Sequence, residues 1–270
     1  MGAALRKRRA AAAPRLDAGE LRAFGTKLRA WYRRNARDLP WRRTRDPYHI
    51  LVSELMLQQT QVSRVLDFWR RFLERFPTLH DLAAAPQAHV LEAWAGLGYY
   101  ARARNLHELS RRVVREGPRA WGEEADATAR AANGAAGRRS ARARDAAPRA
   151  LPLLPAEPEQ LRRLPGIGAY TAGAVATFAF ERRAALVDTN VARVLTRVFA
   201  PRLHPKRARD QQRIWAIAEA TLPRTGAATW THNQALMELG ALVCTARVKR
   251  CGACPVRGIC RSVETGPARG

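Results

Sequence analysis

Four cysteines near the end of the sequence form its clearest chemical pattern. They are the only cysteines in the 270-residue chain, and they are spaced C-x6-C-x2-C-x5-C: Cys244, Cys251, Cys254 and Cys260. In a cytosolic chain such a cluster is typical of metal binding rather than of disulfides. Four thiolates suit either a tetrahedral zinc ion or a [4Fe–4S] cluster. Zinc sites usually contain a pair of C-x2-C motifs, and this sequence has a single one, so the spacing favours the larger cluster.

Two carboxylates have surroundings that are unusual for surface acids. Glu54 has apolar residues at its helical neighbour positions, and Asp188 directly follows the apolar run 184–187. An acid half-buried among apolar residues has a raised pKa and can stay protonated near neutral pH, whereas a hydrogen-bonded acid can stay ionised. The two could therefore act as proton donor and anionic stabiliser. The alternatives are a partly exposed helix-face acid for Glu54 and a simple helix N-cap for Asp188.

The segment Leu-Pro-Gly-Ile-Gly at 164–168 lies between two expected helices. Its glycines, Gly166 and Gly168, let a backbone turn tightly and approach a ligand closely. The helix that follows would present free N–H groups, which bind phosphate. A plain helix–helix turn is the alternative for this motif alone. In a strongly basic chain the phosphate-binding hairpin is the better interpretation.

The charge of the chain indicates a polyanionic partner. It has 48 Lys and Arg residues against 23 Asp and Glu, a formal net charge of +25, which points to nucleic acid. A GC-rich genome is the alternative explanation for the excess of Arg over Lys. No apolar run is long enough to span a membrane, and the N-terminus lacks a signal h-region. We therefore expect a monomeric cytoplasmic protein, nucleoid-associated through DNA, with no membrane partner.

The elements that must position these residues are helices. Apolar residues recur at helical spacing and no segment alternates as a strand does, which predicts an all-α protein. A long helix is expected from Ile50 through Trp69 toward Phe76. Other helices are expected at 21–32, 88–94, 102–114, 159–164, 171–180, 190–198, 210–220 and 233–243. Residues 1–18 are expected to form a mobile basic tail, and 118–151, rich in Ala, Arg and Gly, a disordered insertion; a DNA-contacting arm is the alternative for the insertion.

Five segments together resemble MutY-type adenine DNA glycosylases of the helix–hairpin–helix base-excision superfamily. They are 54–62 (ELMLQQTQV), 96–106 (GLGYYARARNL), 164–173 (LPGIGAYTAG), 187–194 (VDTNVARV) and the four-cysteine loop. The resemblance covers about 21–261, apart from the insertion. The hairpin, Asp188 and the cysteine loop are shared with endonuclease III relatives, whereas LQQTQ and GYYARARN are more specific.

The resemblance implies a two-lobed all-α core with DNA bound between the lobes. One lobe would be an iron–sulfur cluster domain made of 19–46 and 200–265, with a [4Fe–4S] cluster on the four cysteines. The other would be a six-helix barrel at 47–199 that contains the hairpin. The implied partner is double-stranded DNA with a mismatched adenine, contacted in part by Gly166 and Gly168.

The resemblance also assigns catalytic roles. Glu54 would protonate the adenine ring so that it can leave, and Asp188 would stabilise the oxocarbenium ion at the sugar. Tyr170 and Asn190 would hold these groups and the nucleophile in place. Bifunctional relatives have a lysine at the position of Tyr170 and form a Schiff base with the sugar. A phenol cannot do so, and we expect a monofunctional hydrolase.

Further residues are matched to substrate recognition. Gln59 and Tyr99 match residues that enter the base stack near the lesion, which makes sense because extruding a base costs a few kcal/mol. Trp41 and Glu238 match the lining of the adenine pocket. The chain ends ten residues after Cys260, where family members typically continue into a domain that reads 8-oxoguanine. We therefore expect weak discrimination between 8-oxoguanine and guanine. The alternative functions are a thymine or uracil mismatch glycosylase and a non-catalytic DNA-binding module.

Overall fold

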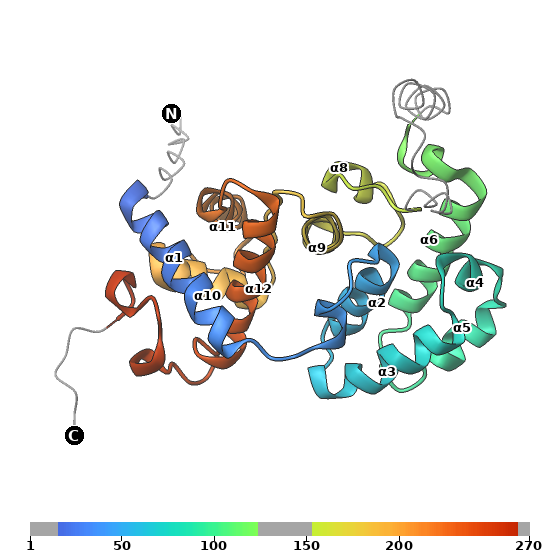
Figure 1. Ribbon diagram of the computed structural model, residues 1–270, viewed down its shortest axis with the longest axis horizontal. Coiled ribbons are helices and arrows are strands. Elements are labelled where there is room, and N and C mark those ends of the chain that lie inside the picture. The colour runs from blue at the N-terminus through green and yellow to red at the C-terminus, as the bar shows by residue number, and fades with distance from the viewer. Residues whose placement is uncertain (1–15, 124–152, 264–270) are drawn as a thin grey trace, which may run out of the picture. The chain divides into compact units, whose positions relative to one another are not determined.

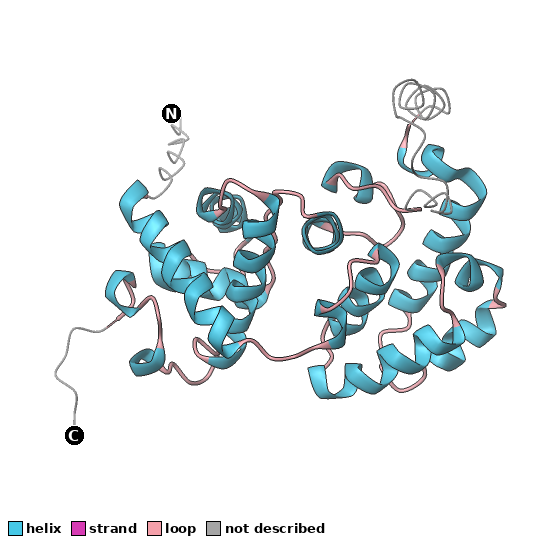
Figure 2. Ribbon diagram, in the orientation of Figure 1, coloured by secondary structure: helices cyan, strands magenta, loops and turns pink. Residues whose placement is uncertain are grey.

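The structure is a computed structural model that describes residues 16–123 and 153–263. In this part of the chain every regular element is helical, and the one β-bridge, between Cys244 and Lys249, is isolated (Figure 2). The all-α prediction is confirmed. Among the described residues, no helix combines the length and the apolar character that a membrane crossing needs.

The chain forms two compact units, and each is built from segments distant in sequence (Figure 1). We call them the hairpin unit and the cysteine unit. The hairpin unit consists of Arg37–Leu186 and Pro223–Thr231. The cysteine unit consists of the described residues up to Ala36, Val187–Leu222, and those from His232 onward. From the sequence, residues 187–199 are expected in the six-helix barrel with the hairpin. The structure instead groups them with the cysteine loop, because two of their arginines are hydrogen-bonded to that loop.

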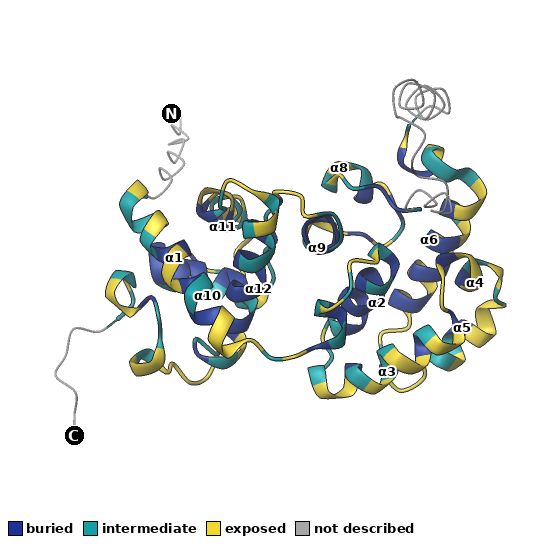
Figure 3. Cartoon of the chain, in the orientation of Figure 1, coloured by how far each residue is buried: buried dark blue, intermediate teal, exposed yellow. Residues whose placement is uncertain are grey.

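The hairpin unit contains most of the helices. They are η1 (Pro40–Arg42), α2 (Pro47–Leu57), α3 (Val62–Arg75), α4 (Leu79–Ala84), α5 (Gln87–Ala93), α6 (Ala101–Glu116), η2 (Gly117–Trp121), α8 (Pro158–Leu161) and α9 (Ala169–Phe180). Within it, α2 packs closely against α9. Both helices are apolar on nearly all sides and are buried along most of their length, as Figure 3 shows. A helix with this pattern belongs in a core, and several of its polar residues, among them Glu54 on α2, are buried with it.

Local signals explain where α2 and α9 begin and how they pack. Asp46 caps α2 by accepting hydrogen bonds from the N–H groups of Tyr48 and His49, and Pro47 occupies the first turn. In α9, Gly173 lies against the carbonyl oxygen of Ala185, where a Cβ atom would come within 2.1 Å. This glycine therefore permits the close approach of the chain to α9.

The cysteine unit contains α1 (Ala18–Asn35), α10 (Thr189–Phe199), α11 (Ala208–Thr221), η3 (Cys251–Ala253), η4 (Arg257–Ile259) and the part of α12 (Gly226–Leu242) from residue 232. Phe24 of α1 is fully buried and packs edge-to-face on Phe199 and His232, at ring distances of 5.0 and 5.9 Å. These contacts join α1 to two helices that come much later in the chain.

The prediction of one long helix from Ile50 to Phe76 is wrong. The structure has two helices, α2 and α3, separated by residues 58–61, and Gln59 within the break has a left-handed backbone (φ 57°). The physical reason is tertiary: hydrogen bonds from a residue distant in sequence hold 58–61 in a turn. The break also frees the last carbonyls of α2, which a buried arginine satisfies, as described below.

Two other sequence expectations change. Helix α4 was missed, although Thr78 and Asp81 form a capping box at its start. The insertion expected at 118–151 begins later, because η2 is folded and Trp121 within it is buried. Of that insertion, residues 124–151 lie outside the described residues, as do residues 1–15 of the expected tail.

Candidate active site and cysteine pocket

Glu54 and Tyr170 meet inside the hairpin unit. Glu54 lies on α2 and is only 4% exposed, so the alternative of a partly exposed helix-face acid is wrong. Tyr170 lies in the first turn of α9, and its hydroxyl donates a 2.8 Å hydrogen bond to Oε2 of Glu54. The apolar character of α2 buries the acid, and the packing of α9 on α2 supplies its partner. The result is a carboxyl group with a fixed orientation in a dry environment.

Asp188 and Asn190 form a second polar pair, in the cysteine unit. Asp188 is the N-cap of α10: its Oδ1 accepts a 2.6 Å hydrogen bond from the N–H of Val191, and its Oδ2 accepts one of 3.1 Å from the Asn190 amide. Burial raises the pKa of the Asp188 carboxyl above its ordinary value, and these hydrogen bonds and the Arg193 charge partly oppose that rise. The N-cap interpretation of Asp188 is thus confirmed, and it leaves a carboxylate held by fixed donors.

Arg193 and Arg197 connect α10 to the cysteine loop. Arg193 donates to Oδ1 of Asn190 at 2.7 Å and to the carbonyl oxygens of Gly240 and Cys244 at 2.8 and 2.9 Å. Arg197, one turn later, donates to the Cys244 sulfur at 3.3 Å and to the Thr245 carbonyl at 2.8 Å. One helix therefore positions both the Asp188–Asn190 pair and the first cysteine. Neither arginine is singled out by its type or spacing in the sequence.

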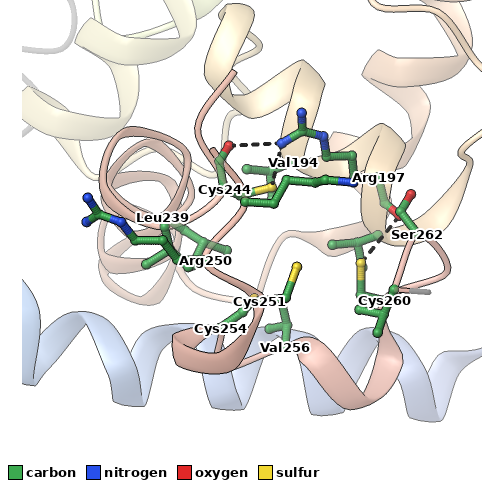
Figure 4. Close-up of a pocket in the computed structure, with 14 residues that line it drawn as sticks. Val194, Arg197, Leu239, Cys244, Arg250, Cys251, Cys254, Val256, Cys260 and Ser262 are labelled. Carbon is green, nitrogen blue, oxygen red and sulfur yellow. Dashed lines mark hydrogen bonds between the residues drawn. The ribbon is translucent and has the colours of Figure 1, made fainter. Parts of the chain in front are cut away.

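The four cysteines line one pocket in the cysteine unit (Figure 4). All four are partly buried, and apolar side chains such as Val194, Leu239 and Val256 close the pocket. Burial raises the pKa of the Cys254 thiol to about 11 and raises that of Cys260 as well. Among the described residues no group of three metal-ligating side chains is arranged to hold a single metal ion. The structure thus brings the four sequence-predicted ligands together around one space.

The hairpin glycines have different surroundings. Gly166 has a left-handed backbone (φ 75°), and a Cβ atom there would lie 2.6 Å from Cβ of Asn105. Gly168 is the N-cap of α9, and a Cβ atom there would meet nothing within 4 Å. Gly166 is thus needed by the turn itself, whereas Gly168 leaves the N-terminus of α9 open to an approaching group.

Gln59 and Tyr99 share an uncommon backbone. Both are non-glycine residues with positive φ, 57° and 48°, and Tyr99 is 59% exposed. A third residue, Arg102, lies between their two loops and is buried. The sequence analysis missed Arg102, although the signal was present: Arg102 occupies the same stripe of α6 as the buried Leu106, Leu109 and Val113. A charged residue on an apolar stripe is a candidate for a specific role.

Trp41 and Glu238 lie in different units. Trp41 belongs to η1 of the hairpin unit, is 7% exposed and packs edge-to-face on Trp69 at 6.1 Å. Glu238 belongs to the part of α12 in the cysteine unit and is fully buried. Their matched role in an adenine pocket stays a prediction.

Comparison with known proteins gives consistent matches. The family model of the HhH-GPD superfamily base excision DNA repair protein matches residues 52–219. The human adenine DNA glycosylase is 39% identical over 255 residues, which cover 91% of this chain and 40% of that protein. The adenine DNA glycosylase of Mycolicibacterium smegmatis is 43% identical over 231 residues, covering 85% and 66%. The chain thus spans about two fifths of the human relative's length.

Solved structures agree on the fold. A thermostable thymine-DNA glycosylase superposes with a TM-score of 0.71 at 26% identity, covering 90% of this chain and 96% of that one. Endonuclease III trapped in a covalent intermediate with DNA superposes with a TM-score of 0.66 at 21% identity, covering 92% and 97%. The two-lobed helical architecture expected from the sequence is therefore that of known base-excision proteins.

Proposed function

We propose that this chain, which belongs to the HhH-GPD superfamily of base excision DNA repair proteins, is a monofunctional glycosylase for mispaired adenine. It would hydrolyse the N-glycosidic bond of adenine opposite guanine or 8-oxoguanine in double-stranded DNA, acting as a monomer. The adenine DNA glycosylases among its relatives support adenine as the leaving base.

The observation that carries the proposal is the hydrogen bond between the buried Glu54 and the half-buried Tyr170. Release of adenine needs a proton on the ring, because the neutral base is a better leaving group than its anion. A carboxyl group that is removed from water is disposed to hold that proton near neutral pH. Tyr170 fixes the orientation of the Glu54 carboxyl through its 2.8 Å hydrogen bond. A phenol at this position forms no Schiff base, which supports hydrolysis without strand cleavage.

Asp188 supplies the complementary group in this scheme. As base and sugar separate, positive charge develops on the sugar, and a carboxylate held by fixed donors stabilises it. The N–H of Val191 and the amide of Asn190 hold Asp188 in one position. Two acids of different surroundings thus divide proton donation from charge stabilisation.

The residues of the cysteine pocket fit a [4Fe–4S] cluster. Cys244, Cys251, Cys254 and Cys260 would hold it, and four cysteines with a single C-x2-C pair that line one pocket suit a cluster of several irons. Bound there, it would cross-link a loop that carries the exposed basic residues Arg247, Lys249, Arg250 and Arg257. These side chains are disposed to contact DNA phosphates.

DNA recognition is assigned to three further features. The N-terminus of α9 behind Gly168 would bind a backbone phosphate. Gln59 and Tyr99 would enter the base stack beside the target adenine, which lowers the cost of extruding it. Trp41 and Glu238 would line the adenine pocket. The net charge of +25 supports a nucleic-acid partner for the whole chain.

A thymine or uracil mismatch glycosylase is the second candidate, favoured by the structural likeness to a thymine-DNA glycosylase. A base-release assay on duplexes with A, T or U opposite G or 8-oxoguanine separates the two. We expect alkali-labile sites from the adenine duplexes alone, and no adduct with borohydride. Release of thymine or uracil with adenine retained would support the second candidate. Binding of every duplex without base release would identify a non-catalytic module.

A further inference from the structure

The side chain of Arg102 makes an unusual number of hydrogen bonds for a residue outside the proposed chemistry. It starts from the first turn of α6, is 8% exposed and donates to seven oxygen atoms. All seven acceptors are uncharged: six are backbone carbonyls and one is a hydroxyl. A buried guanidinium is normally paired with an acid. Here the described residues pair it with backbone instead.

The acceptors belong to the last turn of α2 and to the two loops that carry Gln59 and Tyr99. On the Gln59 side, Nη1 donates to the carbonyls of residues 55, 56 and 58 at 2.6, 2.9 and 2.7 Å, and Nη2 to the Thr60 hydroxyl at 3.4 Å. On the Tyr99 side, Nη2 donates to the carbonyls of 97 and 98 at 3.3 and 3.1 Å, and Nε to that of Tyr99 at 3.4 Å. One planar group therefore holds both loops.

The backbone geometry explains why the loops need such a group. Gln59 and Tyr99 both have positive φ, which side-chain-bearing residues adopt only when surrounding contacts compensate. The α2 helix also ends at Leu57 with carbonyls that have no partner within the helix. The guanidinium donates to the Gln58 carbonyl on one side of Gln59, to the Thr60 hydroxyl on the other side, and to the carbonyl of Tyr99 itself. It also lies against the Tyr99 ring, with its central carbon 5.4 Å from the ring centroid.

We infer that Arg102 is a positioning residue that fixes Gln59 and Tyr99 as one rigid pair for entry into the base stack. This inference rests on the proposed function, since it concerns how the target base is extruded. Arg102 acts through the two loops and touches no reacting atom. This role needs an arginine for a geometric reason. The five N–H donors of its guanidinium lie in one planar fork that reaches both loops, whereas the three donors of a lysine ammonium radiate from a single nitrogen.

The first test compares Arg102→Lys with Arg104→Lys, the same substitution at an exposed position of α6. Single-turnover base release on an A:G duplex is measured at saturating DNA. We expect Arg102→Lys to be slower by about 10- to 100-fold, as for the loss of hydrogen bonds to a charged group, and Arg104→Lys to match the wild type. In a Gln59→Ala/Tyr99→Ala background, Arg102→Lys should slow base release by less than about a further twofold. A full additional loss in that background would overturn the inference.

A fluorescence measurement tests the same role without base release. In a Glu54→Gln background, 2-aminopurine replaces the target adenine opposite guanine, and its fluorescence rises when it leaves the stack. We expect binding to raise the signal with Arg102 and to raise it much less with Arg102→Lys at equal saturation. Equal signals, or no rise in either protein, would overturn the inference. Absence of adenine release by the wild type, with the fluorescence difference intact, would instead count against the proposed function alone.

If Arg102→Lys melts below the assay temperature, Thr60→Val provides a milder variant. It removes the hydroxyl that accepts from the guanidinium at 3.4 Å and donates to the Gln58 carbonyl at 3.3 Å, and it leaves the arginine in place. We expect it to slow release by about two- to tenfold, because both of these hydrogen bonds are long and therefore weak, and to lower the 2-aminopurine signal. A Thr60→Val protein with wild-type rate and wild-type fluorescence would contradict the role of this network.

Discussion

Glu54 and Asp188 show how local surroundings give two similar side chains different chemistry. Glu54 is buried on an apolar helix and receives a hydrogen bond from a phenol, whereas Asp188 caps a helix and is held by a backbone N–H and an amide. The first arrangement favours a proton donor and the second a fixed anion. Each role can be tested with the isosteric amide.

Glu54→Gln should bind mismatched DNA like the wild type and lose base release. The amide has the same shape but no acidic proton, and positioned acids contribute about 10²- to 10⁴-fold. Single-turnover assays and DNA titrations measure the two effects separately. Glu92→Gln, at an exposed glutamate of α5, serves as the control and should change neither. Release by Glu54→Gln at more than about a tenth of the wild-type rate would refute its role as proton donor.

Asp188→Asn should lose activity without losing stability at neutral pH. Because burial raises the pKa of the folded-state carboxyl, the folded protein binds this proton more tightly than the unfolded chain does. The ionised carboxylate therefore costs stability at neutral pH, and this cost disappears as the pH falls below the unfolded pKa of about 3.9. Asparagine still accepts the cap hydrogen bond.

Denaturant unfolding of the wild type and Asp188→Asn at several pH values measures this difference. The variant should be at least as stable as the wild type at pH 7, and its advantage should vanish near pH 3. A variant clearly less stable at pH 7 would show that the hydrogen bonds outweigh desolvation in the folded state. As the pH is lowered, base release by the wild type should also decrease. The decrease should occur at a pH above the usual pKa range of aspartate, because the pKa of Asp188 is raised.

At the scale of elements, the two hairpin glycines have different roles. Gly166 is needed by the fold, whereas Gly168 leaves space for a ligand. Gly166→Ala should destabilise the hairpin unit by about 1–2 kcal/mol, the cost of a left-handed residue with a Cβ atom, and by more because of Asn105. Gly168→Ala should leave stability unchanged, since its Cβ atom meets nothing within 4 Å, and should weaken DNA binding. Thermal melts and DNA titrations of both variants decide this; equal melting points would contradict it.

Most helices could be predicted from the sequence, because their apolar stripes are long and regular. The break between α2 and α3 could not, since a run such as Gln-Gln-Thr-Gln is compatible with an exposed helical turn. Its conformation depends on Arg102, which is distant in sequence and reaches it only through tertiary packing. The candidate site was predictable to a similar extent. Residue types and their neighbours indicate Glu54, Asp188 and the cysteines. The role of Arg193 depends on its hydrogen bond to the cysteine loop, which only the tertiary structure shows.

At the scale of the whole molecule, part of the acid sensitivity should originate in a buried histidine of the cysteine unit. His232 is fully buried, and this burial lowers its pKa to about 3. Its stabilising neutral form is fully present above pH 6.5, and stability is lost as the pH falls from there toward 3. We expect the free energy of unfolding to be roughly 2 kcal/mol lower at pH 5 than at pH 8 from this group.

His232→Leu should remove the part of the pH dependence that comes from this group, because leucine has no proton to gain. Denaturant unfolding between pH 5 and 8 measures the effect. His89→Leu replaces an exposed histidine and should leave the pH dependence as it is in the wild type. An unchanged pH dependence in His232→Leu would place the acid sensitivity elsewhere.

Each of the two units is built from separate segments of the chain, and this affects how the protein folds during translation. Helix α1 emerges first, yet its apolar face packs on Phe199 and His232, and Glu20 in its first turn pairs with Arg261. These partners are translated only after the bulk of the hairpin unit. Throughout that interval Phe24 and Leu28 have no native cover, so the nascent chain presents an unpaired amphipathic helix of the kind that chaperones bind. The cysteine unit is therefore completed last, although it contains the first helix.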